Sequence, residues 1–465
     1  MERRQMLKDA GTWFDSGALL RELSRRVALS TASDIQEPPE LLQPYLSDEI
    51  APLLTSLGFV CEILANPVAG VGSMLIARRV EDPSLPTVLS YGHGDVVNGQ
   101  DASWREGLSP WQLQVEGDRW YGRGTADNKG QHSINIAALR HVITARGGKL
   151  GFNFTLLLEM GEEVGSPGLR EICAQEQARL KADVFIASDG PRVHARKPTV
   201  FLGSRGIVNF SLRIECRQRA FHSGNWGGVL TNPGVVLANA VASMVSPTGR
   251  ILVQGLLPPP LDDTLRAALA DVEVGGDADD PQTNPNWGEP GLSAAERLMG
   301  WNTLEVLALG CGSAERPINA IPATAVAHCQ IRFVPGTPWQ DLQRIVQTHL
   351  NERGYSDVEV AVIAATPATR VNLDNPWVRW TMDSITRSVD KPVTLLPNLA
   401  GSLPNDAFAD ILGLPTLWIP HSYPACSQHA PNEHLLASVA REGLLMMAGL
   451  FWDLGEPGGA PWKVV

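Results

Sequence analysis

The sequence lacks the pairings and runs that define several classes of protein. Its 6 cysteines are scattered over 465 residues without a C-x-x-C pair, which favours neither a zinc ribbon nor a disulfide framework. No apolar run is long enough to span a bilayer, and residues 1–17 lack the apolar centre of a signal peptide. We therefore predict a cytoplasmic protein with no membrane partner.

Positive charge is also scarce. The chain has 38 basic and 50 acidic residues, which gives a formal net charge of −12. An acidic surface disfavours the phosphate backbone of nucleic acids, and no sustained basic patch offsets it, so we expect no nucleic-acid partner. The length is sufficient for two or three domains.

An α/β pattern is present in both outer parts of the chain. Short apolar runs followed by turns are typical of buried parallel strands, and they lie at 86–91, 152–160, 183–188 and 415–420. Helical patterns at 128–145 and 431–454 alternate with these runs. The sequence therefore predicts an α/β fold with a mostly parallel sheet.

The middle of the chain has a different pattern. Residues 210–216 and 324–334 alternate strictly between apolar and polar side chains, which is typical of half-exposed antiparallel strands. One helix is predicted to begin after Asn232, as its N-cap, and a second lies within 338–354. These elements predict a smaller α+β domain.

The parallel pattern returns after about residue 372, so the small domain is predicted to be inserted into the large one. The predicted boundaries are 1–207 for the first part of the catalytic domain, 208–372 for the insert and 373–465 for the second part. The Pro-, Gly- and Asp-rich stretch 247–300 is predicted to be loop with short helices.

Metal-binding side chains follow the predicted parallel strands. Asp127 lies directly before the helix predicted at 128. The other candidates follow the predicted strands, and they are His93, Asp95, Glu162, Glu163, Asp189 and His429. Ligands of an open α/β sheet bind beyond the carboxyl ends of its strands, so these side chains are expected at one edge. Clustered acids need cations, and the sequence therefore predicts a metal centre.

Counting ligands indicates two metal ions. If His93 and Asp189 bind one ion, Glu163 and His429 bind the other, and Asp127 bridges them with a water, each ion has four ligands. Zinc prefers this number, and manganese or cobalt is also compatible with the donors.

Two carboxylates are left over by this count. Asp95 fits the role of orienting His93, because ligating histidines commonly face a carboxylate. Glu162 is adjacent to Glu163 and suits a general base that acts on the bridging water and later delivers the proton. The adjacent glutamates are thus predicted to divide metal binding from proton transfer.

Seven motifs occur in a specific order along nearly the whole chain. They are "SYGHGD", "WYGRGTADNKG", "EMGEEVGSPGL", "ASDG", "FHSGNWGG", "NAIPATAVAHCQIRFVPG" and "QHAPNE". With these motifs the sequence resembles the dinuclear zinc peptidases related to carnosinase, acetylornithine deacetylase and aminoacylase. Within this family, an aspartate at the position of Asp189 in "ASDG" resembles the dipeptidase-like subgroup.

The resemblance implies the roles given above for the metal ligands, Asp95 and Glu162, and a cis peptide between Asp127 and Asn128. It also implies that the insert is a ferredoxin-like domain that forms a homodimer and acts as a lid. In such enzymes this domain carries a histidine that polarises the scissile carbonyl, here His222.

Substrate contacts are implied in the same way. Arg332 resembles the family arginine that binds a substrate carboxylate. Gly401 and Ser402 are expected to open a helix whose backbone N–H groups suit a carboxylate, although Ala400 stands where the family usually has a glycine. Asn319 is a further candidate for a substrate contact.

We therefore expect a homodimeric, dinuclear zinc hydrolase that cleaves an amide bond in a small substrate with a free carboxylate. A dipeptidase is the leading interpretation, and an N-acyl-amino-acid deacylase is the alternative because it shares the metal centre. A non-catalytic member of the family would be expected to lack a metal ligand or Glu162, and none is missing. A nucleotide-binding oxidoreductase is disfavoured because "GRGTAD" lacks the third glycine of the required motif.

Overall fold

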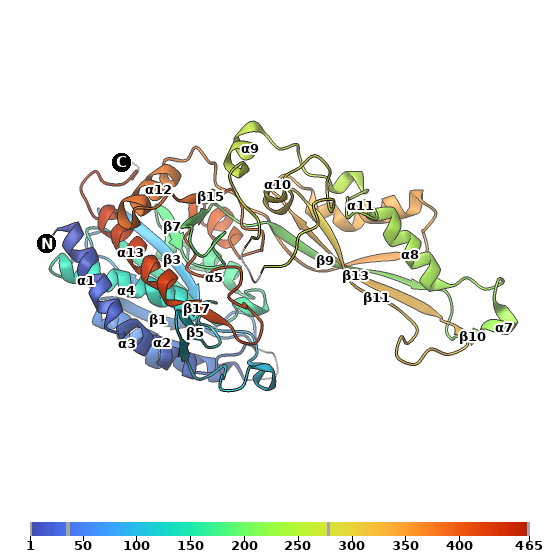
Figure 1. Ribbon diagram of the computed structural model, residues 1–465, viewed down its shortest axis with the longest axis horizontal. Helices are drawn as coiled ribbons and strands as arrows, with labels where there is room; N and C mark the ends of the chain where they lie inside the picture. Colours follow the sequence, from blue (N-terminus) through green and yellow to red (C-terminus); the bar gives the residue numbers. More distant parts are fainter. Residues whose placement is uncertain (1, 34–37, 277–279, 463–465) are drawn as a thin grey trace.

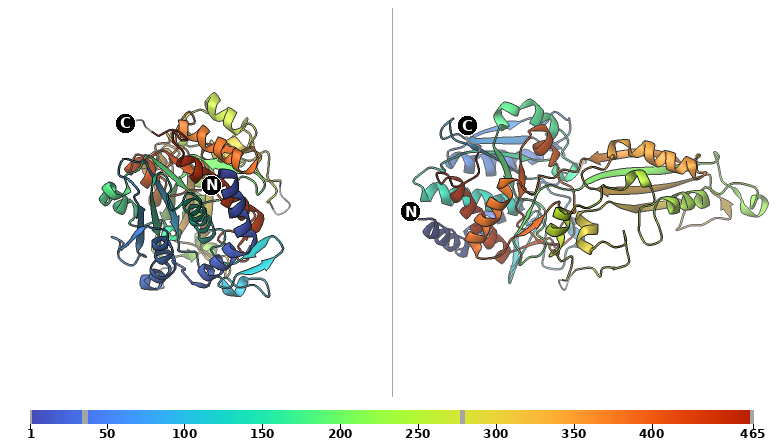
Figure 2. Two further views of the ribbon diagram at one scale, coloured as in Figure 1. Left: turned by 90° about the vertical axis from the view of Figure 1, so that its left-hand side faces the viewer. Right: turned by 90° about the horizontal axis from the view of Figure 1, so that it is seen from above.

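The computed structural model describes residues 2–33, 38–276 and 280–462. It consists of a large α/β domain and a smaller domain that projects from it as an elongated arm (Figures 1 and 2). Among the described residues, every helix is too short or too polar to cross a bilayer.

The large domain is built on an eight-stranded mixed sheet. Its order across the sheet is β1 (Val60–Leu64), β2 (Met74–Arg79), β6 (Asn153–Glu159), β3 (Thr87–His93), β7 (Val184–Ala187), β16 (Thr416–Trp418), β8 (Thr199–Phe201) and β15 (Thr394–Leu396). The central strands β6, β3, β7 and β16 run parallel, while β1 and β2 are antiparallel to their neighbours. The predicted α/β fold with a mostly parallel sheet is confirmed.

Helices cover both faces of this sheet, because its central strands are apolar on both sides. On one face lie α1 (Arg3–Asp15), α2 (Ala18–Ala28), α4 (Lys129–Ala145), α12 (Pro376–Val389) and α13 (Ala437–Leu454). The shorter helices α5 (Leu169–Gln175) and α6 (Gln177–Leu180) and a turn of π-helix at Ala407–Ile411 pack on the other face. All four predicted parallel strands form, three of them within their expected ranges, whereas β3 continues two residues beyond 91 to His93.

One predicted helix begins later than expected. The pattern at 431–454 predicts a single helix, but α13 begins at Ala437, and His434–Leu436 form strand β17. This strand pairs with β5 (Arg119–Tyr121). The local reason is Asn432, whose positive φ of 64° turns the chain before the helix.

The small domain contains a four-stranded antiparallel sheet in the order β11 (Thr303–Cys311), β13 (Thr324–Phe333), β9 (Gly206–Glu215) and β14 (Glu359–Thr366). Helices α8 (Pro233–Met244) and α11 (Leu342–Glu352) pack on one face. The chain order strand, helix, strand, strand, helix, strand is ferredoxin-like, as expected. The Asn232 side chain accepts hydrogen bonds from the N–H groups of Gly234 and Val235, so the predicted cap forms.

Two parts of the small domain matter for the site. The stretch 247–300 is mostly loop, with the short helices α9 (Asp263–Leu269) and α10 (Ala294–Met299) near the large domain (Figure 1). At the opposite end, β10 (Phe221–His222) pairs with β12 (Ala320–Ile321) beside the single turn α7 (Ser223–Trp226). The predicted boundaries at 207/208 and 372/373 stay predictions.

Candidate metal centre

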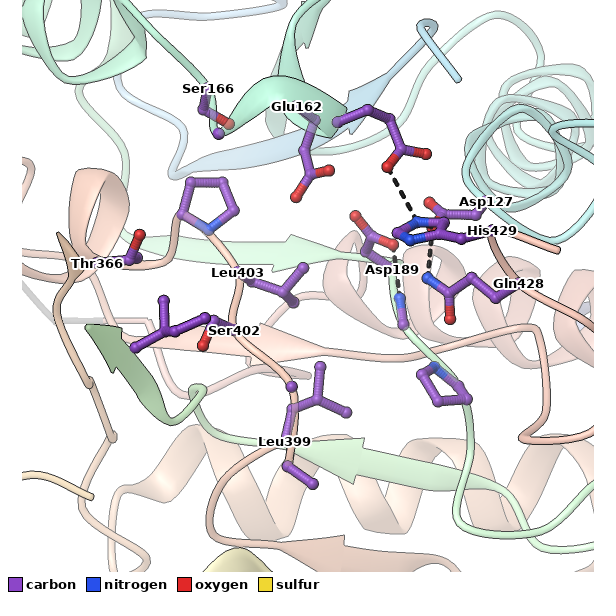
Figure 3. A pocket seen from close by; sticks show the side chains of 18 of the residues that line it. Asp127, Glu162, Ser166, Asp189, Thr366, Leu399, Ser402, Leu403, Gln428 and His429 are labelled. Carbon is purple, nitrogen blue, oxygen red and sulfur yellow. Dashed lines mark hydrogen bonds and ion pairs between the residues drawn. The ribbon is translucent and has the colours of Figure 1, made fainter. Parts of the chain in front are cut away.

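Loops at the carboxyl ends of the central strands form a pocket of about 570 Å³. The large domain contributes Asp127, Glu162, Glu163, Asp189 and His429, whereas Ile207, Arg332 and Thr366 come from the small domain. In Figure 3, Asp127, Asp189, Glu162 and His429 converge on one side of this pocket. The pocket therefore lies between the two domains.

Asp127 lies between two histidines. Its Oδ1 is 2.9 Å from His93 Nε2, and its Oδ2 is 3.1 Å from His429 Nε2. His93 Nε2 is also 3.6 Å from Asp189 Oδ2, and His429 Nε2 is 2.9 Å from Glu163 Oε2. The structure thus brings together the two predicted ligand pairs on opposite oxygens of one shared carboxylate.

The loop that carries Asp127 is fixed by Glu433. The Asp127–Asn128 peptide is cis, as the family resemblance implies. Glu433 Oε1 accepts hydrogen bonds from the N–H groups of Gly124, Ala126 and Asp127, and its Oε2 forms a 2.8 Å ion pair with buried Arg123. Glu433 ends the "QHAPNE" motif, but no role was predicted for it.

Asp95 contacts both His93 and the glutamate pair. Its Oδ1 is 3.3 Å from His93 Nδ1, which is the orienting contact that was expected. Its two carboxylate oxygens also accept hydrogen bonds from the N–H groups of Glu162 and Glu163, at 3.2 and 3.1 Å. One buried carboxylate therefore positions residues from two different strand ends.

The crowding of acids shifts their pKa values. Burial, together with neighbouring carboxylates, raises the pKa of Glu162 well above its usual range, that of Glu163 to about 7 and that of Asp189 to about 6. Burial also acts on Asp127, but hydrogen bonds to His429 and His93 outweigh it and lower the pKa of that carboxyl. Hydrogen bonds to Asp127 and Glu163 raise the pKa of His429 to about 11.

These residues fit divalent cations. Ligand atoms of His93, Asp127 and Glu163 all lie within 4.8 Å of one another. Asp189 Oδ2 is buried and makes no hydrogen bond, so it has an unused lone pair directed into a site of excess negative charge. Histidine nitrogen and carboxylate oxygen are donors that zinc, manganese and cobalt share.

The predicted substrate contacts lie partly in this pocket. Arg332, Gly401 and Ser402 line it, and Arg332 Nη1 donates a 3.0 Å hydrogen bond to Ser402 Oγ. The expected helix start at Gly401 and Ser402 is wrong, because the helical turn begins at Ala407, with Asp406 as its N-cap. Ser402 Oγ instead donates to the Arg205 carbonyl at 2.6 Å. The segment before Ser402 is also hydrogen-bonded to residues 203–205, through the backbone of Leu399.

His222 and Asn319 are not brought to the pocket of their own chain. Both side chains are exposed, and they lie together at the far end of the small domain, where the Ser223 N–H donates to the Asn319 carbonyl at 2.9 Å (Figure 1). Their predicted contact with substrate therefore requires a pocket other than their own.

Two further pocket residues were missed by the sequence analysis. The Gln428 amide donates to Asp127 Oδ2, beside His429. Arg170 also lines the pocket and forms two hydrogen bonds of 2.6 and 2.7 Å with Asp406. Gln428 could have been found as the neighbour of His429 in "QHAPNE"; nothing in the sequence marks Arg170.

Histidines and carboxylates at the strand ends of an α/β domain face a second domain across a pocket, an arrangement that suits metal-dependent hydrolysis. The chain belongs to peptidase family M20/M25/M40, whose model matches residues 89–453. The predicted family, and with it the assignment to the metallopeptidases, is confirmed.

Individual relatives agree with this assignment. The chain is 36% identical over 186 residues to a Beta-Ala-His dipeptidase of Mus musculus. The matched region covers 39% of this chain but only 37% of that protein's length. It is 29% identical over 359 residues to a Cys-Gly metallodipeptidase of Schizosaccharomyces pombe, with 71% and 72% of the two chains covered. The solved structure of the di-peptidase Dug1p from Saccharomyces cerevisiae has the same fold, with a TM-score of 0.80 at 23% identity, covering 98% of this chain and 100% of that one.

Proposed function

We propose that the protein is a homodimeric, dinuclear zinc dipeptidase that hydrolyses the amide bond of a small substrate with a free carboxylate. The observation that carries this proposal is Asp127, which faces a histidine with each of its two oxygens. Family membership and the names of the relatives, which include Beta-Ala-His and Cys-Gly dipeptidases, support the same reaction class.

In this proposal each residue has one task. His93 and Asp189 would hold one ion, Glu163 and His429 would hold the second, and Asp127 would contribute to both sites. Two zinc ions, or manganese or cobalt in their place, would polarise the amide carbonyl and lower the pKa of a water molecule. Glu162 would take the proton of the attacking water and deliver it to the leaving amine, while Asp95 orients His93.

The small domain supplies the substrate contacts. Arg332 is half-buried between the domains, and its guanidinium can bind a carboxylate with two parallel hydrogen bonds. Gly401 and Ser402 line the same wall and would limit the size of the substrate at its carboxyl end. A dipeptide and an N-acyl amino acid both carry such a carboxylate, so Arg332 suits a dipeptidase and a deacylase equally. An experiment has to distinguish these two activities.

A homodimer would give the far end of the small domain a function. His222 would then polarise the scissile carbonyl in the pocket of the partner subunit, and Asn319 would contact the same substrate. β11 is an edge strand with exposed Val306, Leu307 and Leu309, which suits pairing with a second copy. The described cysteines are all free thiols, which agrees with the proposed cytoplasmic location.

The test is hydrolysis by purified protein reconstituted with zinc, manganese or cobalt. A panel of dipeptides and a matched panel of N-acyl amino acids would be scored by amine release, with Glu162→Gln as the control for contaminating peptidases. We expect dipeptides to be cleaved faster and metal analysis to find two ions per chain. Faster cleavage of N-acyl amino acids would establish the deacylase instead, and no cleavage of either panel would overturn the proposal.

A further inference from the structure

A second cavity of about 540 Å³ adjoins the metal pocket, and Arg332 lines both. It is lined by residues of β11 and β13 and by residues between 249 and 274 and between 283 and 302. Its polar lining includes Arg205, Asn302, Glu305, Gln330 and Arg332, and its apolar lining includes Ile251, Val274, Trp287, Leu298 and Trp301. The proposed function gives this cavity no role.

Two guanidinium groups meet where the cavities join. Arg205 Nε donates a 2.9 Å hydrogen bond to the Ala400 carbonyl, and Arg332 Nη1 donates to Ser402 Oγ, so both contact the same short segment of the pocket wall. Burial, together with the positive charge of Arg332, lowers the pKa of Arg205 to about 9. Two cations are therefore held close to each other at the inner end of the substrate pocket.

Neither guanidinium is hydrogen-bonded to a carboxylate of the described residues, although Glu305 is near enough to Arg205 to act on its pKa. Within the part of the chain that the structure describes, Arg205 and Arg332 form no ion pair, and the Nη2 of each donates no hydrogen bond. Arg205 is only 4% exposed. A buried guanidinium without a hydrogen-bonded countercharge is costly, which indicates that an anion from outside the chain completes the site.

The other charges of the cavity leave room for such an anion. Glu289 Oε2 lies 3.4 Å from Arg250 Nε, so the negative charge of Glu289 is already paired. Glu305 stays largely accessible to solvent, and the partial burial of its carboxyl group raises its pKa more than the charge of Arg205 lowers it. A third arginine, Arg297, lines the cavity as well, so its positive charges outnumber its free carboxylates.

We infer that this second cavity receives the side chain of the substrate's carboxyl-terminal residue and selects an acidic one. The α-carboxylate would lie on Arg332 and the side-chain carboxylate on Arg205. This inference rests on the proposed function, because it assumes that Arg332 binds the free carboxylate. It names the substrate class as a dipeptide, or N-acyl compound, that ends in glutamate or aspartate.

The direct test compares pairs of substrates that differ only in charge. Ala-Glu and Ala-Gln have nearly the same shape, as do Ala-Asp and Ala-Asn, and Ala-Ala serves as a reference. We expect kcat/KM to favour the acidic member by about tenfold to a hundredfold, the value of one charged hydrogen-bonded contact. Equal cleavage within the pairs would overturn the inference alone, whereas no cleavage of any dipeptide would overturn the proposed function.

Variants separate selection from a structural role of Arg205. Arg205→Met should reduce the preference for Ala-Glu over Ala-Gln to near unity, whereas loss of support for the Ala400 segment would lower kcat/KM for both equally. Glu305→Gln, at an exposed position, should increase the same preference because it removes a competing negative charge. If Arg205→Met does not fold, two other measurements decide. The inference is contradicted if Glu305→Gln leaves the preference unchanged and if free glutamate and free glutamine inhibit the wild type equally.

Discussion

The two ends of the small domain differ in what surrounds them. At the near end, Arg332 and Ile207 line the metal pocket of their own chain. At the far end, His222 and Asn319 are exposed on a two-stranded ribbon, and neither lines that pocket. Yet the family resemblance implies a substrate contact for residues at both ends.

This difference teaches that one sheet can serve two sites. β13 runs from Thr324, near the far ribbon, to Phe333, next to the pocket, so Arg332, the proposed substrate-binding arginine, and the ribbon lie at its opposite ends. The large domain, in contrast, gathers all its candidate ligands in one place. We therefore expect changes in the large domain to act within one subunit, and changes at the far end to act between subunits.

The largest effect is expected for Asp127→Ala. Because Asp127 faces both histidines, its loss should disturb both metal positions and reduce activity to background. His429→Ala is the matched variant, since it should weaken mainly one ion. Metal analysis after dialysis would check this, and an Asp127→Ala protein that retains two tightly bound ions would contradict the bridging role.

Glu162→Gln should have the next largest effect. The change keeps the size of the side chain and removes the base, so kcat should fall by roughly a hundredfold or more, as expected for lost general acid–base catalysis. Bound metal should stay at the wild-type amount, whereas Glu163→Gln should lose metal. Substantial turnover by a fully metallated Glu162→Gln protein would rule out its role as the base.

His222→Ala tests the far end directly. A donor to the developing oxyanion commonly contributes about 3–4 kcal/mol, so kcat should fall by about a hundredfold to a thousandfold. His328→Ala is the control, because His328 is exposed on the middle of β13 between the two ends. It should retain most of the activity.

Mixing subunits then decides whether His222 acts across a dimer. Heterodimers of His222→Ala and Glu162→Gln would contain one pocket with both groups intact, so activity should return after subunit exchange. Exchange would be verified by native mass spectrometry of differently tagged chains. If heterodimers form and remain inactive, His222 has no role in the partner's pocket, and the contrast between the two ends loses its functional meaning.

The metal-binding side of the pocket could be predicted from the sequence because of how sheets are built. His93, Glu163 and Asp189 follow parallel strands, and the carboxyl ends of such strands meet at one edge. Their mutual proximity therefore follows from the strand pattern. The roles of these residues stay predictions, as does the number of metal ions.

Other features could not be predicted because they depend on contacts between distant segments. Glu433 was placed in the predicted helix at 431–454, because the apolar spacing of α13 extends to residues before its first turn. Some of these residues form strand β17 instead, through pairing with the distant strand β5. Ser402 was expected at a helix start, but the Leu403 N–H bonds to Ser204 Oγ, more than a hundred residues away. Arg205 has no periodic signal, and its burial arises only where both domains meet.

The smallest of these effects is expected at the near end, for Arg332→Met. Methionine preserves most of the apolar stem but removes the charge, so KM for a substrate with a free carboxylate should rise by about tenfold to a hundredfold while kcat changes less. Arg213→Met is the matched control, because Arg213 is exposed on β9 and, among the described residues, forms an ion pair with Glu215 alone. A substrate whose carboxylate is amidated should be cleaved equally by the Arg332→Met variant and the wild type. If the amidated substrate instead loses as much as the free acid, Arg332 supports the pocket wall through Ser402 rather than binding the carboxylate, and the near end would be structural.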